Sequence, residues 1–422
     1  MSARGNRMKA LLLLMFLLIC YAFPLAAQED NCITCHQEME DPDDGPSYKI
    51  VRDVHFQRGL SCVDCHGGDQ SLEDMDEVRE VNGYRGAPSY LEVPEFCGRC
   101  HSDESYMHDH NSSLPTGQVE HYKKSRHGQR LFGKGDTSVA NCVSCHGVHD
   151  IADSKTPHSS THPLNVSHTC GKCHSSADHM SESGLPTDQV EKYSQSVHGI
   201  ALFQRNDLGA PTCNDCHGNH DVAPHGVSSV LAACGDCHAM EWELFQKSPH
   251  KKAFAENDFP MCVTCHSNHD IVKPVDALIG TVDSSLCSNC HESDDGTAGF
   301  ETAIGISFAL KRLVEAERDA QTILDEAIEK GMRTTDEEFR QKEVRQALIQ
   351  SRTSIHSFSL STVQPLAEDG IAKARLVSAN SEKLIDEYYF RRKGLGIATV
   401  FMTILVVALG AAIRRIERHQ DL

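Results

Sequence analysis

The sequence has few aromatic and apolar side chains for its length. Of 422 residues, 6% are Phe, Trp or Tyr, one is Trp, and 39% are hydrophobic. A chain of this length ordinarily forms two or three domains, and this composition leaves their cores short of apolar material. Basic residues are also scarce, since 40 Lys and Arg stand against 60 Asp and Glu, for a formal net charge of −20. Because phosphate binding needs clustered Lys and Arg, no nucleic-acid partner is expected.

Cysteine and histidine are abundant, with 19 Cys and 26 His. All but one of the cysteines fall in nine copies of the pattern CxxCH. The cysteines of the nine motifs are Cys32, Cys35, Cys62, Cys65, Cys97, Cys100, Cys142, Cys145, Cys170, Cys173, Cys213, Cys216, Cys234, Cys237, Cys262, Cys265, Cys287 and Cys290. The histidines that complete them are His36, His66, His101, His146, His174, His217, His238, His266 and His291.

The spacing within each motif has a chemical reason. Two thiols three positions apart can form thioethers with the two vinyl groups of one haem, and the adjacent His then binds the iron. A single CxxC also serves zinc sites and redox pairs, but nine copies that all continue with His favour haem. We therefore predict nine covalently attached haem c groups. The porphyrins would then replace the missing apolar core, and the chain without haem should not fold.

The motifs occur in repeating pairs. The pair at Cys97 and Cys142 and the pair at Cys170 and Cys213 both enclose an LPT segment and an SxHG segment, and both end in CHGxHD. A shorter pair begins at Cys234, and the pair at Cys32 and Cys62 resembles it, with a ninth motif at Cys287. Repetition of this kind indicates an array of stacked units. The predicted fold class is mainly α and irregular, with two-haem repeats in residues 28–295.

Histidines outside the motifs are candidates for the second axial ligand of each iron. Six recur at matched places, three before the second motif of a pair (His127, His198 and His250) and three after it (His149, His220 and His269). His55 matches the first group, while His108 and His179 each lie six residues before an LPT segment. Irons with two His ligands would be low-spin and closed to substrate, which suits electron transfer. Which haem each distal His serves is left open.

The two ends of the chain predict export and anchoring. Residues 1–27 have a basic start, an apolar stretch and small residues before the cleavage point, as in a signal peptide, although an uncleaved N-terminal anchor is the alternative. Residues 394–413 are uncharged and long enough to span a bilayer as a helix. We expect the haem region to be periplasmic, the helix to lie in the cytoplasmic membrane, and residues 414–422 to be cytoplasmic.

Residues 300–390 read as a helical stalk. Leu and Ala recur at steps of three or four from Leu310 to Ala327, and Gly331 should end this first helix. The segment Thr335 to Glu338 predicts a capping box for a second helix, and Pro365 predicts the first turn of a third that continues towards the membrane. His356 is either a packed or solvated residue of this stalk or a ligand of the last haem.

Taken together, the motifs CGxCH, SxHG and CHGxHD resemble those of the exported, membrane-anchored multihaem c-type cytochromes of the doubled-CxxCH class. The resemblance implies electron transfer, with His127, His198, His149, His220 and His269 as axial ligands. The first pair departs from the pattern, with Gly-Gly-Asp where the others have x-x-His-Asp.

The leading hypothesis is a relay between a quinol-oxidising membrane partner and a periplasmic redox protein. The alternatives are a direct quinol dehydrogenase and a nitrite, hydroxylamine or tetrathionate reductase with one open haem. No CxxCK motif occurs to mark a catalytic haem. Whether any haem is open to substrate, the direction of electron flow and the oligomeric state remain unassigned from the sequence.

Overall fold

The chain is mainly helical. The computed structural model describes residues 30–81, 83–221, 229–294 and 296–420, and within these ranges it contains helices, turns and loops but no β-strand. This confirms the predicted mainly α and irregular fold class. The chain divides into two compact units, Met1–Val230 and Leu231–Leu422. The predicted signal peptide lies outside the described residues.

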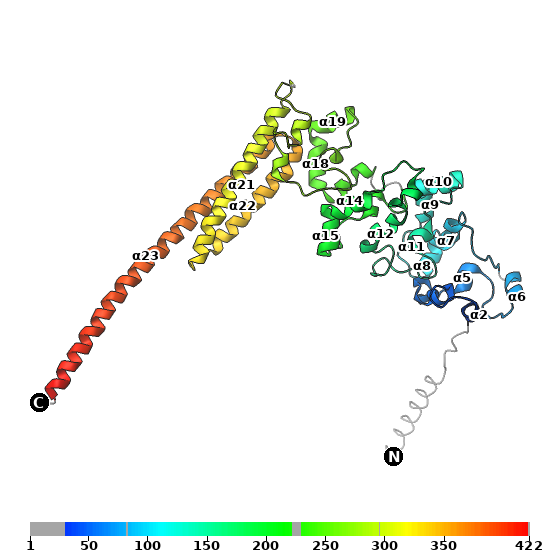
Figure 1. Cartoon of the computed structure of the whole chain (residues 1–422), viewed down its shortest axis with the longest axis horizontal. Coiled ribbons are helices and arrows are strands. Elements are labelled where there is room, and N and C mark those ends of the chain that lie inside the picture. Colours follow the sequence, from blue (N-terminus) through cyan, green and yellow to red (C-terminus); the bar gives the residue numbers. More distant parts are fainter. Residues whose placement is uncertain (1–29, 82, 222–228, 295, 421–422) are drawn as a thin grey trace, which may run out of the picture. The chain divides into compact units, whose positions relative to one another are not determined.

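The first unit consists of short helices joined by loops (Figure 1). In chain order they are α2 (Asn31–Met39), α3 (Pro46–Lys49), η1 (Ile50–Arg52), α4 (Val54–Gln57), α5 (Cys62–His66), α6 (Met75–Glu80), α7 (Val93–His101), α8 (Glu104–Asp109), α9 (Gln118–Lys124), α10 (Arg126–Lys134), α11 (Cys142–His146), α12 (Pro163–His174), α13 (Ala177–Met180), α14 (Gln189–Gln195), α15 (Val197–Arg205) and α16 (Cys213–His217). A buried cluster of Tyr122, Leu131 and Val139, with Tyr90 against it, is small for a unit of this size. The shortage of core material expected from the composition is therefore found here.

The second unit also begins with short helices joined by loops, and it ends in three long helices. Its elements are η2 (Val230–Ala232, at the division between the units), α17 (Cys234–Cys237), α18 (Ala239–Lys247), α19 (Pro249–Glu256), α20 (Cys262–His266), η3 (Asp276–Leu278), η4 (Cys287–Asn289), α21 (Gly299–Glu329), α22 (Thr335–Ser354), η5 (Ile355–Ser357) and α23 (Leu360–Gln420). Figure 1 shows α21 and α22 packed beside the first part of α23, while the rest of α23 continues alone. The helical stalk expected from the sequence is thus a three-helix bundle.

A conventional apolar core runs through this bundle. Its buried side chains come from all three helices, and the larger ones include Leu313 and Leu324 of α21, Val344 of α22, and Ile371 and Val377 of α23. The heptad-like spacing recognised in the sequence therefore corresponds to the buried face of α21. Gly331 follows the end of α21 with a φ of +71°, so the predicted helix end is confirmed.

Two details of the stalk differ from the sequence prediction. The predicted capping box at Thr335 is wrong, because Thr334 is the residue before the helix and its hydroxyl bonds to the Glu338 carboxylate at 2.6 Å instead of to the backbone. The predicted first-turn position of Pro365 is also wrong, since α23 begins at Leu360 and Pro365 lies inside it. A proline there removes one intrahelical hydrogen bond, but Pro365 is exposed, so water can bind the freed carbonyl.

The C-terminal helix is long and apolar enough to cross a membrane. Residues 394–413 lie inside α23, whose most apolar part has a mean hydropathy of 2.4 with none of that stretch buried against the rest of the protein. Length and composition therefore support a membrane anchor at the predicted place. The third stalk helix continues into it without a break, as expected.

The bundle also packs against the last three CxxCH motifs, which belong to the same unit. Arg352 of α22 forms a two-pronged ion pair with Asp276 at 2.9 and 2.7 Å, and Thr353 bonds to Glu241 of α18 at 3.1 Å. Gly299 lies so close to the ring of His291 that a Cβ there would come within 2.2 Å of it. The compact units therefore divide at Val230, whereas the sequence prediction ended the haem region at residue 295.

Candidate functional site

The second motif of each pair forms a helix of its own, five residues long. In α5, α11 and α16 the residue before the first Cys is Ser61, Asn141 or Thr212, and each makes a reciprocal capping box with the residue between the cysteines. Gly67, Gly147 and Gly218 follow the His with φ near +70°, a conformation that glycine adopts at no steric cost. The capped turn holds both Cys and His on one short rigid element.

The fourth such helix, α20, lacks these features. Met261 stands at its cap without a side-chain bond and Ser267 follows its His, both with positive φ of 45° and 64°. Non-glycine residues in this region are strained. This motif reads CHSNHD, with Ser267 where the others have glycine, and the departure has a local cost in backbone strain.

Cysteines of successive motifs are neighbours in space. The Cys97 thiol donates a hydrogen bond to Cys142, which raises the pKa of Cys97 and lowers that of Cys142, and Cys170 with Cys213 and Cys262 with Cys234 repeat this contact. Electrostatic proximity also joins Cys62 to Cys32, Cys65 to Cys100, Cys145 to Cys170, and Cys265 to Cys287. Within each unit, motifs adjacent in the sequence are thus adjacent in the structure.

The histidines that precede a second motif sit at the start of short helices, and a serine side chain caps the helices of two of them. His127 and His198 are the second residues of α10 and α15, where Ser125 and Ser196 accept a bond from the backbone N–H of the following glycine at 3.0 and 3.1 Å. A Cβ on Gly128 would come within 1.9 Å of the Tyr122 carbonyl oxygen. The SxHG sequence therefore encodes a cap, a histidine at the start of the helix and a close crossing of two helices.

Three of these histidines face the His of a motif in the next repeat. The ring centres of His55 and His101 are 5.8 Å apart, and those of His127 and His174 are 6.2 Å apart. In the second unit, His250 of α19 faces His291 at 5.9 Å. The ring planes in these three pairs make angles of 82°, 51° and 89°. Each such His is therefore directed forward along the chain, to the motif that follows its own pair.

The histidines that follow a second motif face backward. His149 lies 6.1 Å from His66 and His220 lies 6.0 Å from His146, so each meets the second motif of the preceding pair. Their ring planes are nearly parallel, at 30° and 12°. The sequence indicated that these histidines mattered but not which motif each would serve.

His356 of η5 makes a pair of the backward kind. Its ring centre lies 6.0 Å from that of His266, at an angle of 26°. Of the two alternatives from the sequence, a place at the last motif is not the one found, since His356 faces the eighth motif and His291 of the ninth faces His250. The loop between α22 and α23 brings it there, a long-range placement that sequence spacing does not reveal.

The six pairs fit haem iron. With a metal–imidazole bond of about 2 Å on each side of an iron, the two ring centres lie about 6 Å apart. Burial keeps the imidazoles neutral, as a metal ligand must be: it lowers the pKa of His127, His146 and His174, and together with neighbouring histidines it lowers the pKa of His220 to about 4. In the part of the chain that the structure describes, no cluster of three or more His, Cys, Asp or Glu is arranged as a metal site. A haem iron does not need such a cluster, because the porphyrin supplies four of its ligands and the protein at most two.

Hydrogen bonds at Nδ1 orient several of these rings so that Nε2 is left for a metal. His55 donates from Nδ1 to Asp53 at 2.8 Å, His66 to the Gly86 carbonyl at 2.8 Å, and His356 to the Thr353 carbonyl at 2.9 Å. His36 donates to Glu40 at 2.8 Å. Neither carboxylate was predicted from the sequence as a partner of these rings. For Glu40, its place four residues after His36 was a usable signal, whereas Asp53 lies two residues before His55, a spacing that carries no such signal.

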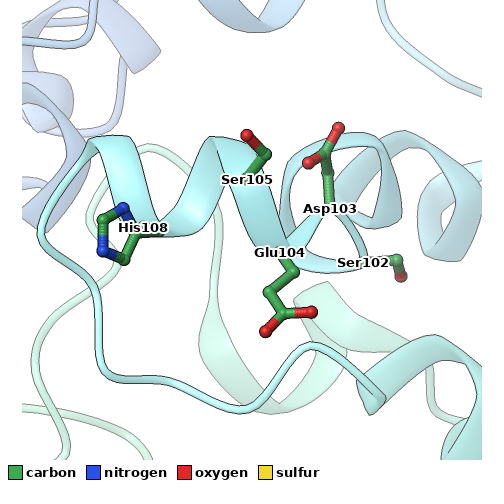
Figure 2. A pocket seen from close by; sticks show the side chains of 5 residues that line it. All are labelled: Ser102, Asp103, Glu104, Ser105 and His108. Carbon is green, nitrogen blue, oxygen red and sulfur yellow. The ribbon is translucent and has the colours of Figure 1, made fainter.

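The remaining candidate ligands are placed as follows. His108 lies on α8 with its side chain 89% exposed, and with Ser102, Asp103, Glu104 and Ser105 it lines an open polar pocket (Figure 2). His179 lies on α13, near His174. His198 lies on α15, and His269 follows α20.

No family model, curated protein or solved structure matches this chain. The candidate sites therefore stand on the repeated motifs and on the histidine pairs.

Proposed function

We propose that the chain is a nonahaem c-type cytochrome that relays electrons between a quinol-linked membrane partner and a periplasmic redox protein. The observation that carries the proposal is the set of six histidine pairs, each of which joins the His of a CxxCH motif to a His outside the motifs at 5.8 to 6.2 Å. A haem held by such a pair supplies a reversible one-electron couple and no free coordination position. An electron carrier needs such a couple, whereas a haem enzyme needs a free coordination position for its substrate.

Neighbouring cysteines support a continuous path within each unit. The thiols that would bind successive haems lie in contact or close to one another, as between Cys97 and Cys142. Because a thioether fixes the edge of its porphyrin, adjacent cysteines bring adjacent porphyrin edges together. Within each unit, the exchange of histidines between repeats then holds one repeat to the next, so the order of motifs in the sequence becomes an order of sites.

The stalk favours a relay through a partner over direct oxidation of a membrane quinol by the motifs of the second unit. His356 pairs with His266 just before α23 begins, and the predicted span begins at Gly394. At a rise of about 1.5 Å per residue, the 34 residues from Leu360 to Gly394 separate these two points by about 50 Å. A quinol confined to the bilayer cannot approach the second unit's motifs across that distance, so its electrons must reach these motifs through another carrier.

The test begins with the full-length protein purified from membranes. Haem content by pyridine haemochrome should be nine per chain, and the oxidised protein should show predominantly low-spin signals. Reduction by a quinol analogue should be slow with the purified protein and fast when quinol-oxidising membranes are added. A soluble periplasmic cytochrome fraction should then reoxidise the protein.

Two results would contradict the proposal. A chain isolated without covalent haem would remove its basis altogether. Rapid reduction of the purified protein by the quinol analogue alone would replace the relay with a direct quinol dehydrogenase.

A further inference from the structure

The two kinds of histidine pair leave the two ends of the array in different situations. Forward histidines serve the motif that opens the following pair, as His55 does for His101. Backward histidines serve the second motif of the preceding pair, as His220 does for His146. In a linear array that follows these two rules, no forward histidine is available for the first motif. Likewise, no backward histidine is available for the second motif of the last complete pair.

The C-terminal end of the array has a substitute donor. No pair follows the one that ends in His266, and the helical bundle supplies His356 in place of a backward histidine at 6.0 Å. The ninth motif receives a forward histidine, His250. Both motifs at this end therefore have a second imidazole.

The N-terminal end has no such substitute among the described residues. His36 belongs to the first motif, no pair precedes it, and in the described ranges no second imidazole ring faces it as the rings in the six pairs do. Its side chain is 47% exposed. Other histidines of this unit are committed elsewhere, with His110 stacked on Tyr106 and His121 bonded to Asp221.

The ring of His36 is also held differently from the ring of His66, the histidine of the second motif. Its Nδ1 donates to the Glu40 carboxylate at 2.8 Å, whereas His66 donates to a neutral carbonyl. Glu40 is fixed in turn by the backbone N–H and the hydroxyl of Ser47 at 3.0 and 2.7 Å. A carboxylate at this position makes an imidazole a stronger electron donor to its metal.

The charge around this motif selects the kind of ligand. Glu38, Asp41 and Asp43 are exposed close to Glu40 in the sequence, and the nearby Lys49 is already paired with Asp44. A negative surface opposes the approach of anions such as nitrite or azide. A neutral ligand that accepts electron density from a reduced iron is favoured by the same arrangement.

We infer that the haem of the Cys32–His36 motif is bound by the protein on one side only, and that its sixth position takes a small neutral ligand of the carbon monoxide or nitric oxide type. This rests on the proposed function in that it requires haem at the motif, and it adds a ligand-binding site at one end of the carrier. His36 is the proximal ligand, and Glu40 is a positioning residue that acts through it.

Carbon monoxide is the probe. The full-length protein, reduced with dithionite, should bind carbon monoxide. The double variant Cys32→Ala/Cys35→Ala should carry one haem fewer and bind one carbon monoxide fewer per chain. In Glu40→Gln the haem content and the stoichiometry should stay unchanged, while the bound carbon monoxide stretching frequency rises because the iron is less electron-rich. Glu38→Gln, an exposed change on the same helix, should leave that frequency in place.

The outcomes separate the two proposals. Nine haems with no carbon monoxide binding would overturn this inference and leave the electron relay standing, since a sixth ligand from a second copy or from the chain terminus would then close the iron. Carbon monoxide binding that persists unchanged in the Cys32→Ala/Cys35→Ala variant would place the open iron elsewhere and overturn it too. Absence of covalent haem would defeat both proposals.

Discussion

At the scale of single residues, Asp53 connects the two kinds of histidine. Its carboxylate accepts from His55 Nδ1 at 2.8 Å and from the backbone N–H of Ile151 at 2.8 Å, two residues beyond His149. The side chain is 2% exposed. Burial alone would raise the pKa of Asp53, but the bonds from His55 and Ile151 outweigh it and hold the pKa below its usual value.

Replacing Asp53 by Asn should weaken this junction. The amide keeps the shape but loses a charged acceptor, so we expect a loss of about 1–3 kcal/mol of stability and a higher reduction potential for one haem, because His55 becomes a weaker donor. A lowered folded-state pKa stabilises the protein above the unfolded pKa, so the difference between wild type and variant should vanish as the pH falls below about 4. Thermal melts against pH and a redox titration measure both effects. Asp153→Asn, an exposed change, is the control, and equal melting of Asp53→Asn and wild type at pH 7 would rule out the role.

At Gly128 the packing leaves no room for a side chain. A Cβ there would overlap the Tyr122 carbonyl, whereas Gly133 on the same helix has open space around it. We expect Gly128→Ala to destabilise the protein by about 1–3 kcal/mol through overpacking and to disturb the His127–His174 pair. Gly133→Ala should be neutral or slightly stabilising, because Ala favours a helix over Gly. Melting temperatures and the low-spin spectrum compare the two, and equal effects would show that the helix crossing is unimportant.

At the scale of elements, the two positions of a ligand within the repeat produce two ring geometries. Forward histidines are the second residue of a short helix and meet their partners at 51° to 89°. Backward histidines follow a glycine turn or lie in η5, and they meet theirs at 12° to 30°. The angle between two axial imidazoles controls the splitting of the iron d orbitals, so it divides low-spin haems into two spectroscopic kinds.

We therefore expect two families of ferric signals in electron paramagnetic resonance. Steeply crossed rings should give large-gmax signals, and nearly parallel rings should give rhombic ones. The spectrum of the oxidised full-length protein at low temperature measures this directly. A spectrum with rhombic signals alone would mean that the crossed arrangement is not kept.

The short element η5 has a role of its own, since it carries His356 to the eighth motif. The variant His356→Ala should open that iron, so reduced protein should bind one more carbon monoxide per chain than the wild type. The substitution is in a loop between helices and should cost little stability in the bundle. His158→Ala, at an exposed loop position, is the matched control, and unchanged binding in His356→Ala would exclude the ligand role.

At the scale of the whole molecule, the chain uses two kinds of core. The first unit has a small side-chain core and many cysteines and histidines, and the bundle of the second unit has a continuous apolar core along α21, α22 and α23. The bundle can therefore fold by ordinary apolar burial, and it stands between the last motifs and the predicted membrane segment.

A chain ended after Lys393 should separate these roles. It keeps the apolar core of the bundle, whose last member is Val377, and removes the apolar part of α23. We expect it to leave the membrane fraction while it retains the full haem content and the low-spin spectrum. Fractionation with alkaline extraction measures the first property and pyridine haemochrome the second. Continued membrane attachment would point to another anchor, and loss of haem would show that the span is needed for assembly.

Local chemistry determined what could be predicted from the sequence by itself. The CxxCH motifs, the recurrence of His127 and His149 in equivalent places, the end of α21 at Gly331 and the apolar span all depend on neighbours within a few residues, so spacing alone reveals them. The tertiary structure decided which histidine faces which motif. That choice depends on chain reversals such as the one that brings His356 to His266, where residues 90 positions apart in the sequence meet. It also decided how the two ends of the array differ. His266 near the C-terminal end receives a second imidazole from His356 of the bundle, whereas His36 at the N-terminal end has no second imidazole facing it among the described residues.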